Sequence, residues 1–305
     1  MVPADRVNIL ADTWALVEGG RGQPEDFFRL VDELGNDDSR AVWEQVLRTL
    51  ARLDHLELDR PGRAAFQAYV RRVLRPVFDR LGWDATASEA NDRALLRARL
   101  VGALGAFGDE AILDEAKRRF AGYLTDPASL PVDLRDAVIH LAGRGADRAT
   151  YDALLRLARQ STRTDERVRY YSAAASARDP ALARETLAIA LTDELPNSLV
   201  STLISWVASQ GEHRDLAWEF VRMNFAALGE KLGPSFRRTY VSGLFATFTD
   251  PARAVELGNF APVHETSGGR IVAARTQERI MTAADFISQN LPAVDDWVKN
   301  HTARR

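Results

Sequence analysis

The stretch of residues 92–120, DRALLRARLVGALGAFGDEAILDEAKRRF, constrains the fold more than any other part of the chain. Apolar residues recur there at helical spacing, which predicts two amphipathic helices. Gly108 suits the left-handed end of the first helix, and Asp109 can cap the free backbone N–H groups that open the second. The apolar positions are Leu96, Leu100, Ala103, Leu104 and Phe107 in the first helix, and Leu113, Ala116 and Phe120 in the second.

A helix pair of this kind cannot bury its apolar face alone and needs similar pairs on both sides. Comparable pairs recur along the chain every ~30–45 residues, which is the period of HEAT and armadillo arrays. Strand signals are nearly absent, because β-branched residues are scattered rather than alternating. We therefore predict an all-α, HEAT/armadillo-like α-solenoid of about sixteen antiparallel helices with a concave face. The predicted pairs span residues 4–34, 38–81, 89–124, 132–160, 164–191, 196–228, 234–262 and 268–300.

Four prolines stand where a helix should begin, because the first helical turn does not use the N–H group that proline lacks. These are Pro24, Pro180, Pro234 and Pro251. Pro76 is different, since it falls inside the apolar pattern of FQAYVRRVLRPVFDRLGW. Either one helix kinks at Pro76 or two helices meet near Arg75. The stretch EGGRGQP at residues 18–24 lacks a preceding strand and a following lysine, so it indicates an interhelical turn rather than a phosphate loop.

Large side chains spread along the sequence indicate a continuous core. Tryptophans occur about once per helix pair, which favours core packing over a stacking surface for bases. They are Trp14, Trp43, Trp83, Trp206, Trp218 and Trp297. Arg97 lies one helical turn after Arg93 and directly follows Leu96. We interpret Arg97 as a structural side chain that bridges adjacent helices, in preference to a substrate contact.

The charge and composition of the chain exclude several classes of function. The chain has 305 residues and a net charge of -3, so nothing in its overall charge favours nucleic acid or an anionic membrane as a partner. It has no cysteine, which excludes disulfides and thiolate chemistry. No run of ~18 consecutive apolar residues occurs, so no membrane-spanning helix is expected. The start, MVPADRVNIL, has neither the basic nor the apolar segment of a signal peptide.

Zinc peptidase chemistry requires two histidines one helical turn apart with a glutamate between them. His264 and Glu265 begin such a motif, but Gly268 stands where the second histidine would be, and the surrounding APVHETSGGR has a loop-like composition. The other histidines are dozens of residues apart, and we interpret them as surface or helix-end residues. They are His55, His140, His213 and His301. We predict no metal ligand, no cofactor and no catalytic residue in this chain.

Several segments, taken in order, resemble a known family. They are VPADRVNILADTWAL at the start, LLR with a small-residue run and EA-x-RRF in 92–120, SLPVDLRDAV at 129–138, LAWEFVRMNF at 216–225 and TQERIMTAADFISQNLPAVDDWV near the end. Over essentially its full length the chain resembles the C-terminal helical domain of the puromycin-sensitive and endoplasmic-reticulum aminopeptidases, which are zinc exopeptidases. The resemblance implies a single C-terminal helical-repeat domain over residues 1–305, excised from a larger aminopeptidase, with Met1 as an added start.

In that family the zinc ion and its HExxH helix belong to a separate upstream domain. The resemblance therefore implies a non-catalytic domain whose concave face covers the active-site cleft and shapes the access of peptide substrates. The implied partners are that upstream catalytic domain and peptides, with no nucleic acid and no membrane. We expect the isolated chain to be inactive, zinc to be held by the absent domain, and the location to be cytoplasmic.

Antigen-trimming members of the family anchor the C-terminus of a peptide with basic and tyrosine side chains on inner helices of this domain. An ungapped comparison places one such lysine at Arg52, which implies a substrate-binding role for this arginine. A guanidinium on a concave face can pair with a peptide carboxylate; the alternative is an exposed helix charge. Two further basic positions of this type fall near Ala175 and Ser209, where the charge is lost. In this respect the chain is more similar to the puromycin-sensitive type.

Period and composition also fit a free-standing helical-repeat scaffold that binds a protein or peptide in its groove. The gene sequence upstream of Val2 separates these two hypotheses, because a catalytic domain would carry HExxH and a distal glutamate there. A nucleic-acid-binding helical repeat is a third alternative. The acidic charge balance and the lack of a basic stripe in the sequence disfavour it.

Overall fold

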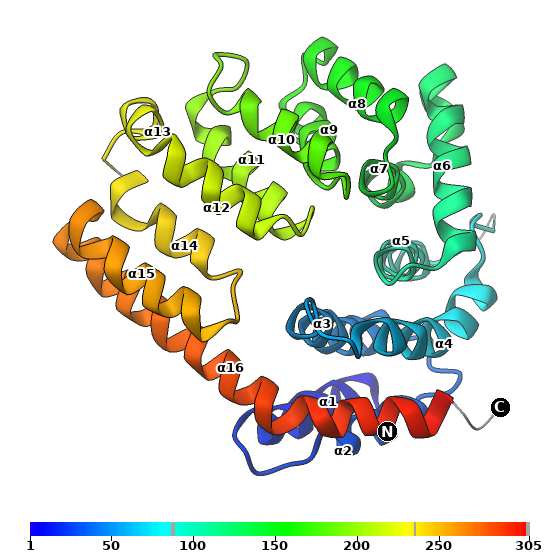
Figure 1. Ribbon diagram of the computed structural model, residues 1–305. Helices are drawn as coiled ribbons and strands as arrows, with labels where there is room; N and C mark the ends of the chain where they lie inside the picture. The colour runs from blue at the N-terminus through cyan, green and yellow to red at the C-terminus, as the bar shows by residue number, and fades with distance from the viewer. Residues whose placement is uncertain (87–88, 235, 303–305) are drawn as a thin grey trace. The chain divides into compact units, whose positions relative to one another are not determined.

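The computed structural model describes residues 1–86, 89–234 and 236–302. Within these ranges the chain forms sixteen α-helices with connecting turns and no β-strand (Figure 1), which confirms the predicted all-α fold. The helices divide into two compact units, Met1–Val138 with Asp285–Arg305 as unit 1 and Ile139–Ala284 as unit 2. The single-domain organisation and the concave face predicted for the array stay predictions.

Unit 1 is built from helix pairs that pack in chain order. Its helices are α1 (Pro3–Glu18), α2 (Pro24–Glu33), α3 (Arg40–Leu56), α4 (Arg63–Leu81), α5 (Asn91–Ala106), α6 (Glu110–Thr125), 3₁₀ turns at Pro127–Ser129 and Val132–Leu134, and the C-terminal part of α16 (Ser267–Thr302). α3 packs against both α1 and α5, and α4 packs against α5 (Figure 1). Each pair thus covers the apolar face of its neighbours, as in an α-solenoid.

An aromatic cluster holds the C-terminal part of α16 within unit 1. The Phe28 ring of α2 lies at its centre, with its centroid 5.5 Å from the Tyr69 ring of α4 and 5.9 Å from the Trp297 ring of α16. Trp14 of α1 lies 5.9 Å from Phe286 of α16. All five side chains are buried, and burial of aromatic rings contributes strongly to packing energy. Residues from opposite ends of the sequence therefore share one core.

The turn between α5 and α6 forms as the sequence predicts. Gly108 adopts a left-handed φ of 76°, and the Asp109 carboxylate accepts a hydrogen bond from the Ile112 backbone N–H at 3.1 Å. The same carboxylate accepts from Arg75 Nη1 of α4 at 2.9 Å, so the cap also joins α6 to the preceding pair. The buried face of α6 is Ile112, Ala116, Phe120 and Tyr123. The predicted Leu113 is only half-buried, because the cap turns Ile112 toward the core instead.

Unit 2 continues the same pattern of packed helices. Its helices are α7 (Arg135–Arg144), which begins in unit 1, α8 (Arg148–Gln160), α9 (Thr164–Ala175), α10 (Pro180–Ile189), α11 (Asn197–Ser209), α12 (Arg214–Met223), α13 (Phe225–Leu232), a π-helical turn at Phe236–Tyr240, α14 (Val241–Phe245), α15 (Pro251–His264) and the N-terminal part of α16. α8 packs against α9, and α11 packs against α9, α12 and α13. Gly143 of α7 lies so close to α9 that a Cβ atom there would be 2.0 Å from the Ala173 carbonyl oxygen.

Prolines mark helix starts in some places and are tolerated inside helices in others. Pro24, Pro180 and Pro251 begin α2, α10 and α15, as predicted. α4 is continuous across Pro76, so one helix rather than two occupies residues 63–81. α16 is a single helix of 36 residues with Pro292 inside it, so the predicted pair within residues 268–300 is wrong. Leu291 and Val294, both fully buried beside Pro292, keep α16 continuous because their burial outweighs one lost backbone hydrogen bond.

Two further helix boundaries differ from the prediction. The segment 196–228 contains α11, α12 and the start of α13, because the chain breaks at Asn224. α13 is one helix more than predicted and the single α16 is one fewer, so the described residues still contain sixteen α-helices. The stretch APVHETSGGR is mostly helical, since α15 continues to His264 and α16 begins at Ser267. The buried Ala261 anchors the last turn of α15, so tertiary packing overrides the loop-like composition.

The tryptophans lie in the core as predicted, with two partial exceptions. Trp14, Trp43, Trp218 and Trp297 are buried, whereas Trp83 and Trp206 are half-buried. The Trp83 ring packs edge-on against Phe78 with a centroid separation of 5.7 Å, and the Arg119 guanidinium lies 4.8 Å from its centroid.

Candidate functional site

Arg52, the predicted substrate contact, lies on α3 with 58% of its side chain exposed. Its Nε is 3.1 Å from a carboxylate oxygen of Glu18 at the end of α1. The same oxygen accepts a hydrogen bond from the Trp14 indole N–H at 2.9 Å, which holds the carboxylate in place. An exposed ion pair of this kind contributes about 0–1 kcal/mol, so a competing carboxylate can replace Glu18 at little cost. The substrate role of Arg52 stays a prediction.

The two positions at which the family resemblance indicated lost charges lie in different surroundings. Ala175 is fully buried at the end of α9, so its side chain packs inside unit 2 and does not face a ligand. Ser209 ends α11, is exposed, and donates a hydrogen bond to the Ser205 carbonyl at 2.7 Å. Neither position offers a cation to a peptide.

Arg97 is structural, as predicted. Its side chain is 1% exposed and its Nη2 lies 2.5 Å from a Glu89 carboxylate oxygen. Its Nε donates to the Gly82 carbonyl at 2.9 Å, and its Nη2 also donates to the Leu81 carbonyl at 3.3 Å. Arg97 therefore joins α5 to the C-terminal end of α4 and to the connecting segment, which leaves it no access to a substrate.

The His264–Glu265 pair has a structural role. The exposed His264 ring stacks on Phe260 with a centroid separation of 4.1 Å. Glu265 is buried and accepts a hydrogen bond from Ser242 Oγ at 3.0 Å, and burial raises the pKa of its carboxyl. Among the residues that the structure describes, no group of three or more His, Cys, Asp or Glu side chains is placed to hold a metal ion.

His140 does not match its predicted position at a surface or helix end. It lies inside α7 and is half-buried, because this face of α7 packs in unit 2. Burial, together with the nearby charges of Arg144 and Arg178, lowers the pKa of His140 to about 4. The ring is therefore neutral at pH 7.

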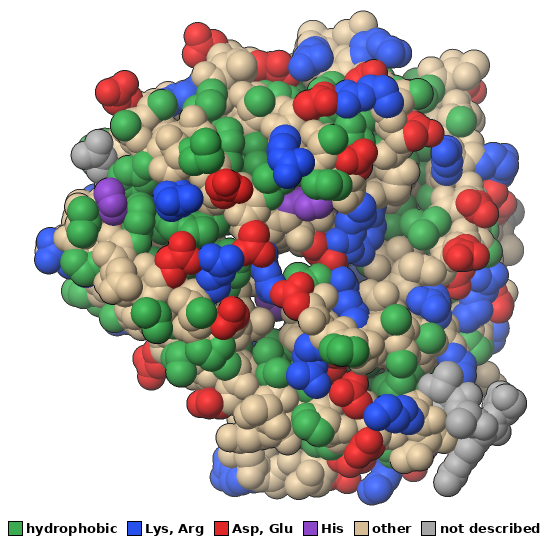
Figure 2. Space-filling model, viewed as in Figure 1, with side chains coloured by type: hydrophobic (Ala, Val, Ile, Leu, Met, Phe, Trp, Pro, Cys, Tyr) green, Lys and Arg blue, Asp and Glu red, His purple; other side chains and the backbone are tan. Residues whose placement is uncertain are grey.

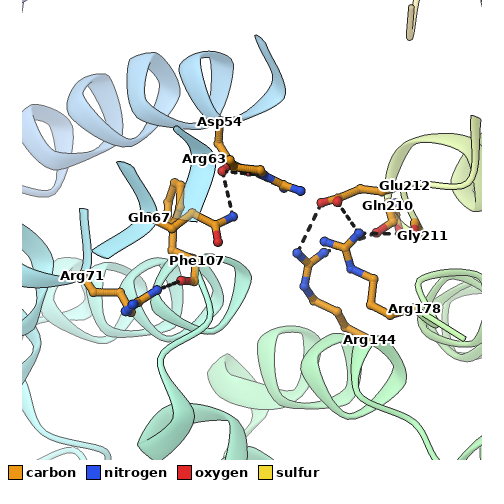
Figure 3. A network of polar contacts seen from close by, with 10 residues as sticks. All are labelled: Asp54, Arg63, Gln67, Arg71, Phe107, Arg144, Arg178, Gln210, Gly211 and Glu212. Carbon is orange, nitrogen blue, oxygen red and sulfur yellow. Dashed lines mark hydrogen bonds and ion pairs between the residues drawn. The ribbon is translucent and has the colours of Figure 1, made fainter. Parts of the chain in front are cut away.

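In unit 1, α4 carries a row of polar side chains spaced one helical turn apart (Figure 3). Arg63 pairs with Asp54 of α3 through two atoms, Nε at 3.0 Å and Nη2 at 2.7 Å. Gln67 donates to the same carboxylate at 2.8 Å. Arg71 donates to the Phe107 carbonyl at the end of α5 at 2.5 Å. These contacts tie the ends of α3 and α5 to α4.

In unit 2, two arginines at the C-terminal ends of α7 and α9 pair with one carboxylate (Figure 3). Arg144 ends α7 and Arg178 follows α9, and both pair with Glu212 in the turn between α11 and α12. Arg144 Nη1 also donates to the Gln210 carbonyl at 3.4 Å, and Arg178 Nη1 donates to the Gly211 carbonyl at 3.4 Å.

The sequence contains a signal for this cluster that motif reading misses. Arg144 and Glu212 are 68 residues apart, and Arg178 stands midway between them. One helix pair separates each from the next, so the three residues occupy equivalent places at the ends of α7, α9 and α11. Helix-pair boundaries predicted from composition are uncertain by several residues. This uncertainty hides the equal sequence spacing of the three residues.

A pocket of about 340 Å³ opens elsewhere in unit 2. Its lining is uncharged and includes Ser201, Phe236 and Tyr240. The Tyr240 hydroxyl donates to the Ser201 carbonyl at 3.0 Å, and burial raises its pKa. The pocket thus offers an aromatic wall and neutral hydroxyls, with no acid or base poised for chemistry among its lining residues.

The visible surface carries charges of both signs. Lys and Arg side chains lie among Asp and Glu side chains over the face shown in Figure 2. This mixture agrees with the net charge of -3. Among the helices that the structure describes, none is both long enough and apolar enough to cross a membrane.

The helix pairs pack in chain order, and arginine–carboxylate contacts join their ends. This arrangement is typical of an α-helical repeat protein. The family described as the ERAP1-like C-terminal domain matches residues 1–282, and the chain belongs to this family. The match confirms the resemblance to the C-terminal helical domain of zinc aminopeptidases that the sequence segments indicated.

The chain is also similar to individual aminopeptidases. It is 29% identical over 280 residues to aminopeptidase M1-A of Oryza sativa subsp. japonica, covering 90% of this chain and 31% of that protein. It is 29% identical over 215 residues to aminopeptidase M1 of Arabidopsis thaliana, covering 68% of this chain and 24% of that protein. It is 23% identical over 308 residues to glutamyl aminopeptidase of Sus scrofa, covering 97% and 32%. The chain spans about a quarter to a third of the length of these curated relatives.

Proposed function

We propose that this chain is the non-catalytic C-terminal domain of a zinc metallo-aminopeptidase, where it covers the active-site cleft and shapes the access of peptide substrates. The observation that carries the proposal is the family match over residues 1–282. The similarity to relatives named aminopeptidases supports it, since nearly the whole chain matches only part of each relative. Enclosing a cleft excludes folded proteins, admits flexible peptides and keeps bulk water from the reacting groups.

Zinc belongs, in this proposal, to the upstream catalytic domain. A catalytic zinc needs three protein ligands and an open position, and the described residues of this chain hold no fitting group. We therefore derive no catalytic step from this chain. Its proposed partners are the upstream domain and peptide substrates, and its proposed location is the cytoplasm. Movement of the helical array against the catalytic domain would open and close the cleft.

The isolated chain is expected to show no peptidase activity. The test is to purify residues 1–305, add zinc, and measure release of the chromophore from an aminoacyl chromogenic substrate. The same assay on the protein with its upstream domain should show turnover that a chelator removes. Chelator-sensitive turnover by the isolated chain, absent from a mock purification, would contradict the proposal. An upstream gene sequence without HExxH would instead favour the free-standing scaffold.

Replacing Arg52 by glutamate in the complete enzyme should affect long peptides more than single aminoacyl amides. Reversal of the charge removes a partner for a peptide carboxylate, so kcat/KM for long peptides should fall by about tenfold, or about 1.4 kcal/mol. Cleavage of aminoacyl amides should be unchanged. Arg99→Glu is the matched control, because Arg99 lies on α5 with 68% exposure and its Nε is 3.6 Å from Glu44. Equal losses for both substrates, or for both variants, would make Arg52 an ordinary surface charge.

A further inference from the structure

We propose that the pocket of about 340 Å³ in unit 2 binds a neutral, flat aromatic group that carries a hydrogen-bonding amide. Two sources share this chemistry, a free aromatic amide and an aromatic side chain within a peptide. The inference does not rest on the proposed function, because it concerns the lining of one pocket within unit 2. Small-molecule sites have volumes of about 300–1,000 Å³ and combine apolar walls with a few polar groups, and this pocket meets both criteria.

One wall of the pocket is a pair of stacked aromatic rings. The Phe236 and Tyr240 rings have centroids 5.2 Å apart and planes inclined by 24°. The Phe236 side chain is buried, and its ring also lies 5.2 Å from the Phe225 ring, so packing fixes the wall. A flat ring that enters the pocket can pack on this wall through its face or its edge, which adds to the free energy gained by burial. An aliphatic group of the same size gains from burial alone.

The polar groups of the pocket carry no charge, and each can donate or accept a hydrogen bond. They are the hydroxyls of Ser198, Ser201 and Thr239 and the side-chain amide of Asn197. None of the described lining residues is charged, so an ion that enters loses hydration without gaining an opposite charge. Lys231 precedes the lining residue Leu232, but its Nζ contacts the Thr192 carbonyl and lies 3.5 Å from an Asp193 carboxylate oxygen. The pocket therefore favours a neutral ligand.

Hydrogen bonds from side chains to the backbone hold the walls of the pocket together. The Tyr240 hydroxyl donates to the Ser201 carbonyl at 3.0 Å, which joins the aromatic wall to α11. Asn197 Nδ2 donates to the Lys231 carbonyl at 2.8 Å, which joins the start of α11 to the end of α13. The pocket is therefore preorganised, and little loss of conformational entropy opposes binding.

The aromatic wall belongs to a rare type of backbone. Phe236–Tyr240 is a π-helical turn, and Phe236, Thr239 and Tyr240 of this turn all line the pocket. π-helical turns are uncommon, and they occur frequently at functional sites. The turn places three lining residues within five positions of the chain, which supports a binding role for this wall.

The test measures ligand binding to residues 1–305 from chemical-shift changes in two-dimensional NMR spectra. Benzamide is the neutral aromatic probe. Cyclohexanecarboxamide lacks the aromatic ring, and benzoate and benzylammonium carry a negative and a positive charge. N-acetylphenylalaninamide represents an aromatic side chain within a peptide. Thr239→Trp fills the pocket from an exposed position, and Thr162→Trp, at an exposed position in the turn between α8 and α9, is the matched control.

Benzamide should bind the wild-type chain with a Kd of about 1 mM or tighter, with the largest shift changes at the lining residues. Cyclohexanecarboxamide and the two charged probes should bind about fivefold more weakly or worse. Thr239→Trp should weaken benzamide binding at least about tenfold, whereas Thr162→Trp should leave it unchanged. Tighter binding of N-acetylphenylalaninamide than of benzamide identifies a peptide side chain as the source, and weaker binding identifies a free aromatic amide.

Several results would overturn the proposal. They are the lack of saturable benzamide binding to wild type at about 10 mM, shift changes centred away from the lining residues, and a charged or aliphatic probe that binds as tightly as benzamide. Equal benzamide affinities in wild type and Thr239→Trp would also overturn it. If Thr239→Trp fails to fold, Ser198→Trp makes the same comparison from an exposed position on α11.

Discussion

Replacing Gly143 by alanine should lower the free energy of unfolding of unit 2 by about 3 kcal/mol, because the new methyl group overpacks a rigid contact. A Cβ atom at Gly143 would lie 2.0 Å from the Ala173 carbonyl oxygen and 2.5 Å from its carbonyl carbon. Both atoms belong to the backbone of α9, whose Ala174 and Ala175 are fully buried. The helix therefore cannot withdraw without opening the core behind it.

Urea denaturation followed by helical circular dichroism measures this effect. Gly102→Ala is the matched control, since a Cβ atom on this α5 glycine would lie 3.9 Å from the nearest side chain, an ordinary contact. Gly102→Ala should leave the denaturation midpoint unchanged or raise it, because alanine favours a helix over glycine by about 1 kcal/mol. An unchanged midpoint for Gly143→Ala would show that α7 and α9 can separate slightly without loss of packing.

The stability of unit 1 should fall as pH rises from about 4.5 to about 7, because Glu57 resists ionisation in the folded state. The Glu57 side chain is fully buried at the end of α3, and its Oε1 has no hydrogen-bond partner among the described residues. Burial and the nearby Asp295 carboxylate, partly offset by Arg60, raise the pKa of Glu57 to about 7. Arg60 bridges the two carboxylates at 3.3 Å from each.

The sign of the pH effect follows from the unfolded state. Unfolded Glu57 ionises near pH 4.5, so this residue contributes its full stabilisation below that pH, and the contribution is lost as pH rises through the folded pKa. The loss is at most about 3 kcal/mol. Glu57→Gln removes this dependence and should be more stable than wild type at pH 8, while the two proteins should be similar near pH 4.5.

Glu115→Gln provides a control of opposite sign. Hydrogen bonds from Arg118 and Arg119 lower the pKa of Glu115 to about 2, so its ionised form stabilises the fold at neutral pH. Glu115→Gln should therefore lose stability at pH 7, whereas Glu57→Gln should gain it. Thermal unfolding of the three proteins between pH 4.5 and pH 8 makes the comparison. Parallel pH profiles for wild type and Glu57→Gln would show that Glu57 is hydrated in the folded chain.

Local features of the structure could be predicted from the sequence because neighbouring residues determine them. The apolar stripe of α5, the left-handed Gly108 and the Asp109 cap all depend on residues within one or two helical turns. The structural role of Arg97 was predictable for the same reason, since its partner Glu89 is only eight residues away. The substrate role predicted for Arg52 came from family resemblance and stays a prediction.

Features that depend on distant residues could not be predicted in this way. The continuity of α16 across Pro292 follows from aromatic rings such as Trp297, which packs on Phe28 from near the start of the chain. Composition gives no weight to such a partner, and a helix pair was predicted over residues 268–300. Arg144 meets Glu212 because the two helix pairs between them have the same length in residues. An error of a few residues in a predicted helix boundary hides this equal spacing.

The sequence by itself determined that this protein is an array of helix pairs. It also determined where most helices begin and turn and which family the chain belongs to. Those properties depend on periodicity, capping residues and the order of short segments, all of which are local in the chain. Only the tertiary structure decided which helix ends meet, which glycine touches a neighbouring backbone and which glutamate is buried. Those properties arise from packing between residues far apart in sequence, where burial and close contact outweigh local preference.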